Sequence, residues 1–232
     1  MKSLEQANSK FFDERFPWAE IQRERALSDT GVLDLLREAC LIESYFPVYT
    51  AKMVELFWDD VAATSIFTIE AIEAYGHYFS LRRYLDLVGY RPVTDKEVIA
   101  LRDQDRQAVH HDKVKELVNF MGTEHFAAEF FRDLAAMTTE PVLQGMLPRF
   151  AAEEVLHSEF AFDLLHRMLQ ADPGVKARIL TQAADFQHVG SYVMPVVRPA
   201  KDDNLDVIRS FDMKVGRLVG TRLSDSLAAR RL

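Results

Sequence analysis

Hydrophobic residues recur along most of this chain at steps of three and four, which is the period of an α-helix rather than of a strand. The pattern predicts four long helices, over residues 32–60, 63–89, 111–140 and 141–170, and shorter helices over residues 93–105, 175–193 and 204–227. Helices of this length, joined by short connections, pack most simply as a bundle. We therefore predict an all-α fold with a four-helix core.

Prolines and glycines give the expected interruptions of these helices. Pro47 lies inside the first helix, where it removes a backbone hydrogen bond and would bend the helix. Gly122 marks a candidate break and Pro148 a candidate kink, whereas Gly89 ends the second helix. No low-complexity linker separates the helices, so we predict a single domain over residues 1–232.

The composition narrows the classes of function. With 28 Lys and Arg against 36 Asp and Glu, the formal net charge is −8, and no basic run is present, which argues against a nucleic-acid partner. No apolar stretch is long enough to span a membrane, and the first residues lack the apolar core of a signal peptide, so we predict a cytoplasmic protein. Cys40 is the only cysteine; any metal would therefore be held by Glu, Asp and His.

Four glutamates fall at a matched spacing in the two predicted helical hairpins. Glu43 precedes Glu73 by 30 residues, and Glu124 precedes Glu154 by 30 residues. A chain that rises along one helix, turns and descends along the next returns to the depth at which it started. Each pair of carboxylates can therefore lie at one level of the bundle.

Two histidines complete this pattern. His77 lies about 40° from Glu73 around its helix, and His157 lies about 60° from Glu154. Carboxylate-bridged di-iron sites in helical bundles use one Glu from each of two helices and a Glu-x-x-His pair from each of the other two. Four carboxylates neutralise two divalent irons, and two imidazoles add ligands without charge. The predicted ligands of two Fe ions (Fe²⁺/Fe³⁺) are Glu43, Glu73, His77, Glu124, Glu154 and His157.

The first Glu and His pair departs from the required spacing. The sequence "EAYGH" has Gly76 where the histidine is expected, and His77 follows one position later. A π-bulge near Gly76 would restore the alignment of Glu73. Alternatively Glu70 is the ligand, because it lies seven residues before His77 and only about 20° from it around the helix. In a third interpretation the first half of the site is weakened and one iron is poorly held.

Several segments resemble the soluble acyl-ACP desaturases, which are di-iron members of the ferritin-like superfamily. "EHFAAEFFRDLA" and "FAAEEVLHSEFAFDLLHRMLQADPG" are similar to the family's helix-three Glu, its A-D-E-K-R-H-E-like helix and its D-P-D-G turn. "IESYFPVYT" and "GHYFSLRRYLDLVGY" match two earlier segments, and "MPVVRPAKDDNLDVI" resembles a later one. On these matches Glu43, His77, Glu124, Glu154 and His157 correspond to iron ligands. The resemblance spans roughly residues 36–215.

The resemblance implies a ferritin-like four-helix bundle core with additional N- and C-terminal helices. It also implies an O2-dependent oxidoreductase that desaturates or hydroxylates an acyl chain or a related small apolar substrate, free or tethered to acyl carrier protein. A ferredoxin-type electron donor and a homodimer belong to the same expectation. Two departures bear on the reaction. The family's ligand Glu falls on Ala74 when His77 is aligned, and a family Thr one turn beyond Glu124 is Ala127.

Other functions remain compatible with the same residues. A ferroxidase or iron-binding ferritin-like protein would need no organic substrate, a di-iron N-oxygenase would use a different one, and an interaction protein could keep the bundle with a degenerated site. Glu153, beside Glu154, is a candidate for orienting a ligand. Six aromatic residues are candidates for either a substrate pocket or plain core: Phe67, Phe79, Phe126, Phe130, Phe131 and Phe150.

Overall fold

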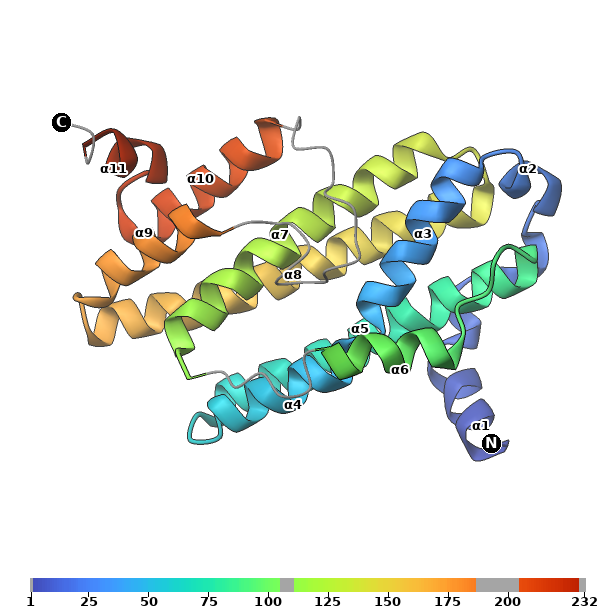
Figure 1. Cartoon of the computed structure of the whole chain (residues 1–232), viewed down its shortest axis with the longest axis horizontal. Helices are drawn as coiled ribbons and strands as arrows, with labels where there is room; N and C mark the ends of the chain where they lie inside the picture. Colours follow the sequence, from blue (N-terminus) through green and yellow to red (C-terminus); the bar gives the residue numbers. More distant parts are fainter. Residues whose placement is uncertain (1, 105–110, 187–204, 230–232) are drawn as a thin grey trace.

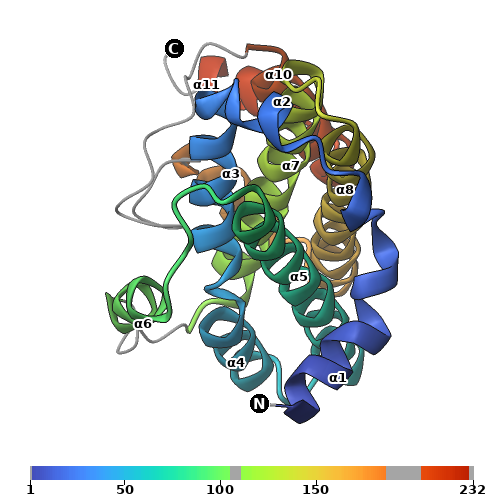
Figure 2. The same ribbon diagram turned by 90° about the vertical axis from the view of Figure 1, so that its right-hand side faces the viewer.

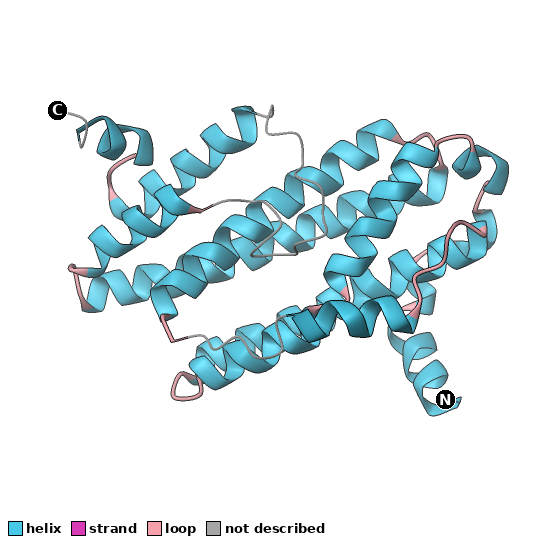
Figure 3. Cartoon of the chain, viewed as in Figure 1, coloured by secondary structure: helices cyan, strands magenta, loops and turns pink. Residues whose placement is uncertain are grey.

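The structure, a computed structural model, describes residues 2–104, 111–186 and 205–229. Within these ranges the regular elements are all helices, which confirms the predicted all-α fold (Figures 1 and 3). They are α1 Lys2–Phe11, α2 Arg23–Leu27, α3 Thr30–Glu43, α4 Phe46–Leu56, α5 Val61–Val88, α6 Asp95–Gln104, α7 Lys113–Met137, α8 Pro141–Ala171, α9 Val175–Asp185, α10 Leu205–Val219 and α11 Leu223–Ala229, with 3-10 turns η1 Asp13–Arg15 and η2 Trp18–Glu20. None of the described helices has the length and apolar character that a membrane crossing requires.

Helices α3, α5, α7 and α8 form a ferritin-like bundle. The sequence-adjacent helices α7 and α8 make the most extensive helix pair, α3 packs on α5, and α5 also contacts α8 (Figure 2). Two hydrophobic clusters occupy the bundle. One includes Leu36, Tyr84 and Phe150, and the other includes Phe67 and Leu165. On α5, α7 and α8 the predicted ligands fall between the residues of these two clusters, so apolar layers close the predicted site on both sides.

The first predicted helix, over residues 32–60, is in fact two helices. Helix α3 ends at Glu43, and α4 begins at Phe46 with Pro47 in its first turn. A proline there sacrifices no helical hydrogen bond, because the first N–H groups of a helix have no intrahelical partner. The prediction of one bent helix was therefore wrong, and Glu43 projects from the last turn of α3.

Two further helices differ from their predicted extents. Helix α7 is continuous through Gly122, and the glycine is explained by packing, since a Cβ there would lie 2.6 Å from the Phe186 ring. Helix α8 is continuous through Pro148, and the kink predicted there stays a prediction. The helix predicted over residues 204–227 is divided into α10 and α11, with Gly220 at a φ of 71° between them. The last part of the helix predicted over 175–193, and residues 194–204 of the family-like "MPVVRPAKDDNLDVI" segment, lie outside the described residues.

Helix α6 begins with a capping box that makes its stability dependent on pH. The Glu97 carboxylate accepts hydrogen bonds from Thr94 N at 2.9 Å and Thr94 Oγ1 at 2.8 Å, and it pairs with Arg37 of α3. The bond from the Thr94 backbone, followed by the one from Arg37, lowers the pKa of Glu97 from 4.5 to about 2. Because this folded-state pKa is depressed, the stabilisation is complete above about 4.5 and is lost as the pH falls through about 2.

We therefore expect Glu97→Gln to lower the free energy of unfolding by about 1 kcal/mol at neutral pH, a value reduced by the partial exposure of the pair. The difference from wild type should shrink as the pH falls below 4.5. Urea unfolding across a pH series would measure it. Glu55→Gln, a change at an exposed position of α4, is the control. An effect of Glu97→Gln that is independent of pH would contradict this assignment.

Candidate metal centre

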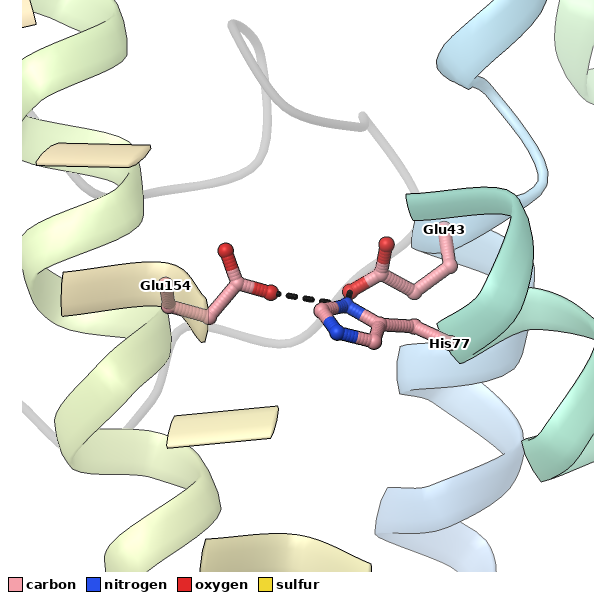
Figure 4. A group of neighbouring side chains, drawn as sticks. All are labelled: Glu43, His77 and Glu154. Carbon is pink, nitrogen blue, oxygen red and sulfur yellow. Dashed lines mark ion pairs between the residues drawn. The ribbon is translucent and has the colours of Figure 1, made fainter. Parts of the chain in front are cut away.

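The bundle brings two groups of ligand-type side chains together at its centre. Glu43, His77 and Glu154 form one group, and Glu124, Glu154 and His157 form the other, with the potential ligand atoms of each group within 4.8 Å of one another. Glu154 belongs to both groups. Its Oε1 lies 3.0 Å from His77 Nδ1 (Figure 4). Its Oε2 lies 2.9 Å from His157 Nδ1, so one carboxylate lies between two imidazoles.

Two further carboxylates reach the same imidazoles from other helices. Glu43 Oε1, at the end of α3, lies 3.6 Å from His77 Nδ1, and Glu124 Oε2, on α7, lies 4.0 Å from His157 Nδ1. Both approach the Nδ1 atoms, as Glu154 does. The Nδ1 atoms therefore face the shared interior of the cluster, and the Nε2 atoms face away from it.

Glu70 faces the interior of this cluster. It is 5% exposed and lines a cavity of about 100 Å³ together with Glu43, Glu124, Glu154 and His157. Its Oε2 is buried and has no hydrogen-bond partner, and neither does His77 Nδ1, despite its close approach to Glu154. Buried polar atoms without partners are costly and require an explanation, and a cation in this cluster would satisfy both.

Glu73 lies behind His157. Its Oε2 is 2.7 Å from His157 Nε2, its side chain is 30% exposed, and it is not among the residues that line the cavity. Glu153 takes the corresponding position on the other imidazole, with Oε2 2.7 Å from His77 Nε2. Carboxylates in such positions fix the orientation of a histidine whose other nitrogen binds metal. Glu153 thus contacts a predicted ligand and Glu73 makes a matching contact, and the orienting role of Glu153 stays a prediction.

The prediction of a π-bulge near Gly76, which would have realigned Glu73, is wrong, because α5 is α-helical from Val61 to Val88. Glu70 and His77 are instead separated by nearly two regular turns, which directs both side chains toward α8. Of the two alternatives left open by the sequence, Glu70 is the one whose side chain lines the cavity with the other predicted ligands, although neither residue belongs to the two groups of close ligand atoms.

Burial and mutual charge shift the pKa values of the cluster strongly. Burial raises the pKa of Glu43, raises that of Glu70 to about 8, and raises that of Glu124 well above its usual range. Burial would also raise the pKa of Glu154, but the charges of His77 and His157 lower it well below normal. Burial opposes protonation of His157, yet Glu154 raises its pKa to about 10. The shifts of Glu43, Glu70, Glu124 and His157 thus all favour the protonated forms of these groups.

The donor set fits a pair of divalent first-row metal ions. Four interior carboxylates provide four negative charges, the imidazoles provide neutral nitrogen ligands, and oxygen and nitrogen donors of this kind suit iron or manganese. Glu154 is placed to serve two ions at once. Binding would exchange the protons of the cluster for metal charge, which also removes the penalty of burying several carboxylates together.

The remaining wall of the cavity is mostly apolar. It is formed by Ile42, Tyr45, Phe46, Tyr49, Ala74, Phe120, Thr123 and Ala127. None of the six phenylalanines considered from the sequence is among the described lining residues; Phe67, Phe131 and Phe150 are fully buried in the two hydrophobic clusters. Ala74 and Ala127, where the resemblance predicts a Glu and a Thr, both line the cavity.

One contact beside the site could not be predicted from the sequence. Arg15, in the turn η1, pairs with Glu153 across 138 residues of sequence. No helical period or short motif connects these positions, and only the tertiary structure reveals the contact.

Comparison with curated proteins finds two relatives from Mycobacterium tuberculosis, strains CDC 1551/Oshkosh and H37Rv. Each is named "Putative acyl-(acyl-carrier-protein) desaturase DesA2" and is 31% identical to this chain over 129 residues. The match covers 51% of this chain and 44% of each relative, so the chain matches less than half the length of these relatives. No protein-family model matches the chain. No solved structure matches it either.

Proposed function

We propose that this divergent acyl-ACP desaturase-like protein is a di-iron oxidoreductase that uses O2 to desaturate or hydroxylate an acyl chain or a related small apolar substrate. The observation that carries the proposal is Glu154, whose two oxygens approach His77 and His157 beside an apolar cavity. The similarity to the two mycobacterial relatives supports the same class of chemistry.

The proposed ligands follow the two groups of side chains. Glu43, His77 and Glu154 would hold one iron, and Glu124, Glu154 and His157 the other. We assign Glu70 as the fourth interior carboxylate and Glu73 as the group that orients His157. Two bound iron ions would supply the electrons for O2 reduction and the oxidising power to cleave a C–H bond.

The protein's own contribution is a cavity with aromatic residues in its wall. Tyr45, Phe46, Tyr49 and Phe120 line it, and they would hold an apolar group against the carboxylates while excluding water. The cavity of about 100 Å³ is well below the size of pockets that enclose drug-sized ligands. This favours a small substrate, or a short segment of a longer chain, as the part that reaches the metals.

The same wall supports the proposal over two of its rivals. Its aromatic residues favour an organic substrate over a ferroxidase, and the buried carboxylates favour a metal site over an interaction protein, because burying them without a partner is costly. Tethering of the substrate to acyl carrier protein is part of the proposal, in line with the name of the relatives. The ferredoxin-type donor, the homodimer, the cytoplasmic location and the single domain over residues 1–232 stay predictions from the sequence.

Anaerobic titration with ferrous iron tests the proposal. We expect about two irons per chain, and a visible absorption band on exposure to O2. Acyl thioesters of increasing length, free and on acyl carrier protein, would then be examined by mass spectrometry for loss of two hydrogens or gain of one oxygen. Binding of less than about one iron without a band would overturn the di-iron site. Iron oxidation that no organic compound alters would favour the ferroxidase.

A further inference from the structure

The segment before α2 lies directly behind the first histidine. Arg15 forms an ion pair with Glu153 Oε1, and Glu153 Oε2 lies 2.7 Å from His77 Nε2. The side chains of Arg15 and Glu153 are each only 18% exposed. An unbroken chain of polar contacts thus runs from the N-terminal turn η1 through α8 to the proposed ligand on α5.

Several contacts fix this N-terminal turn to the bundle. Arg149 of α8 donates a hydrogen bond to the Arg15 carbonyl at 3.0 Å, and Arg83 of α5 pairs with Asp13. The buried Phe16 ring packs edge-on against Phe150, 5.9 Å between centroids. The Arg15 backbone is therefore held on α5 and α8, and its guanidinium is directed at Glu153 without depending on a flexible loop.

Gly76 provides the space for this arrangement. A Cβ at this position would lie 2.9 Å from Arg15 Nη1 and 3.0 Å from the Phe12 ring. A methyl group would therefore displace the guanidinium or the aromatic ring. The glycine that interrupts the expected Glu-x-x-His spacing is thus explained by the close approach of the N-terminal turn to α5, one residue before His77.

We infer that Arg15 is a positioning residue for the proposed metal centre. It holds Glu153 so that this carboxylate accepts the proton of His77 Nε2, which leaves Nδ1 directed at Glu43 and Glu154. The inference rests on the proposed function for its metal-binding consequence. It also goes beyond that function. The N-terminal turn η1 carries no predicted ligand, yet the inference makes it a part of the half of the site that contains His77.

Arg15→Ala is the primary test, with Arg167→Ala as its matched control. Arg167 forms an ion pair of 2.9 Å with Asp60, which also links α8 to α5 but lies outside the cluster. Titrations with Fe²⁺ and Co²⁺ should show one of two metals binding about 10-fold or more weakly in Arg15→Ala. The other metal should bind as in wild type, and Arg167→Ala should leave both unchanged. Arg15→Lys, which keeps the charge, should recover part of the loss.

A second readout needs no metal. In protein labelled with ¹⁵N-histidine, Arg15→Ala and Gly76→Ala should both shift the His77 Nε2 resonance and leave that of His157 in place. Unchanged affinities for both metals together with an unchanged His77 resonance would overturn the inference. If wild type binds no metal, the proposed function fails, while the NMR comparison still decides the role of Arg15. If Arg15→Ala does not fold, Arg15→Lys carries the same comparison with a smaller expected shift.

Discussion

Glu154→Ala is expected to abolish binding of both metal ions, whereas loss of any other proposed ligand should remove no more than one. Glu154 is the one carboxylate shared by the two groups, 3.0 Å from His77 Nδ1 and 2.9 Å from His157 Nδ1. Without it, each group keeps a single imidazole and a single close carboxylate, which is too few to hold a divalent ion tightly. Metal content after anaerobic loading and desalting should fall from about two per chain to about zero.

The control for this prediction is Asp163→Asn, a change of the same charge on the exposed face of the same helix. It should retain the full metal content. Circular dichroism would establish that both variants keep their helices, and Glu154→Gln provides a variant of the same shape. One tightly bound metal in Glu154→Ala would show that the two groups do not share this ligand.

Glu70→Ala and Glu73→Ala should give different results although the residues lie one helical turn apart. Glu70 is buried in the cavity with an unpartnered oxygen, whereas Glu73 contacts His157 from outside the cluster. We expect Glu70→Ala to lower the metal content from about two to about one and to eliminate the reaction with O2. Glu73→Ala should keep both metals but bind one of them about 10- to 100-fold more weakly.

Competitive titration with a chelator would measure both affinities, and stopped-flow absorption would follow the reaction with O2. Each variant serves as the control for the other, because both remove one carboxylate from the same part of α5. The reverse pattern, in which Glu73→Ala loses a metal and Glu70→Ala only weakens one, would restore Glu73 as the ligand and exclude the present assignment.

Much of the fold could be predicted from the helical period of the hydrophobic residues and from local signals at the helix ends. The helix ending at Gly89 and the helix from Pro141 are found within about two residues, because a left-handed glycine cap and an N-terminal proline are local signals. The 30-residue spacing places Glu124 and Glu154 in one group because the rise along a helix is constant, whereas the same spacing from Glu43 leads to Glu73, which lies outside the cavity. The use of Glu43, Glu124 and Glu154 as metal ligands stays a prediction.

Other features depend on packing that no local signal determines. Pro47 has the same sequence signature whether it bends a helix or begins one, and the contacts of α3 and α4 with α5 decide between them. Glu70 and Glu73 are about 60° apart around α5, so both face the bundle and the position of α8 decides which enters the cavity. The Arg15 contact joins residues 138 apart, beyond the reach of any periodic pattern.

The extensive packing of α7 against α8 also has a consequence for how the chain folds. These helices are neighbours in sequence, and contacts between sequence neighbours form sooner than contacts that close long loops. Glu124, Glu154 and His157 all lie on this pair, whereas Glu43 and His77 join only when α3 and α5 dock. We expect one half of the centre to exist on a partly folded chain, so that a metal ion captured there is in place before the second half closes around it.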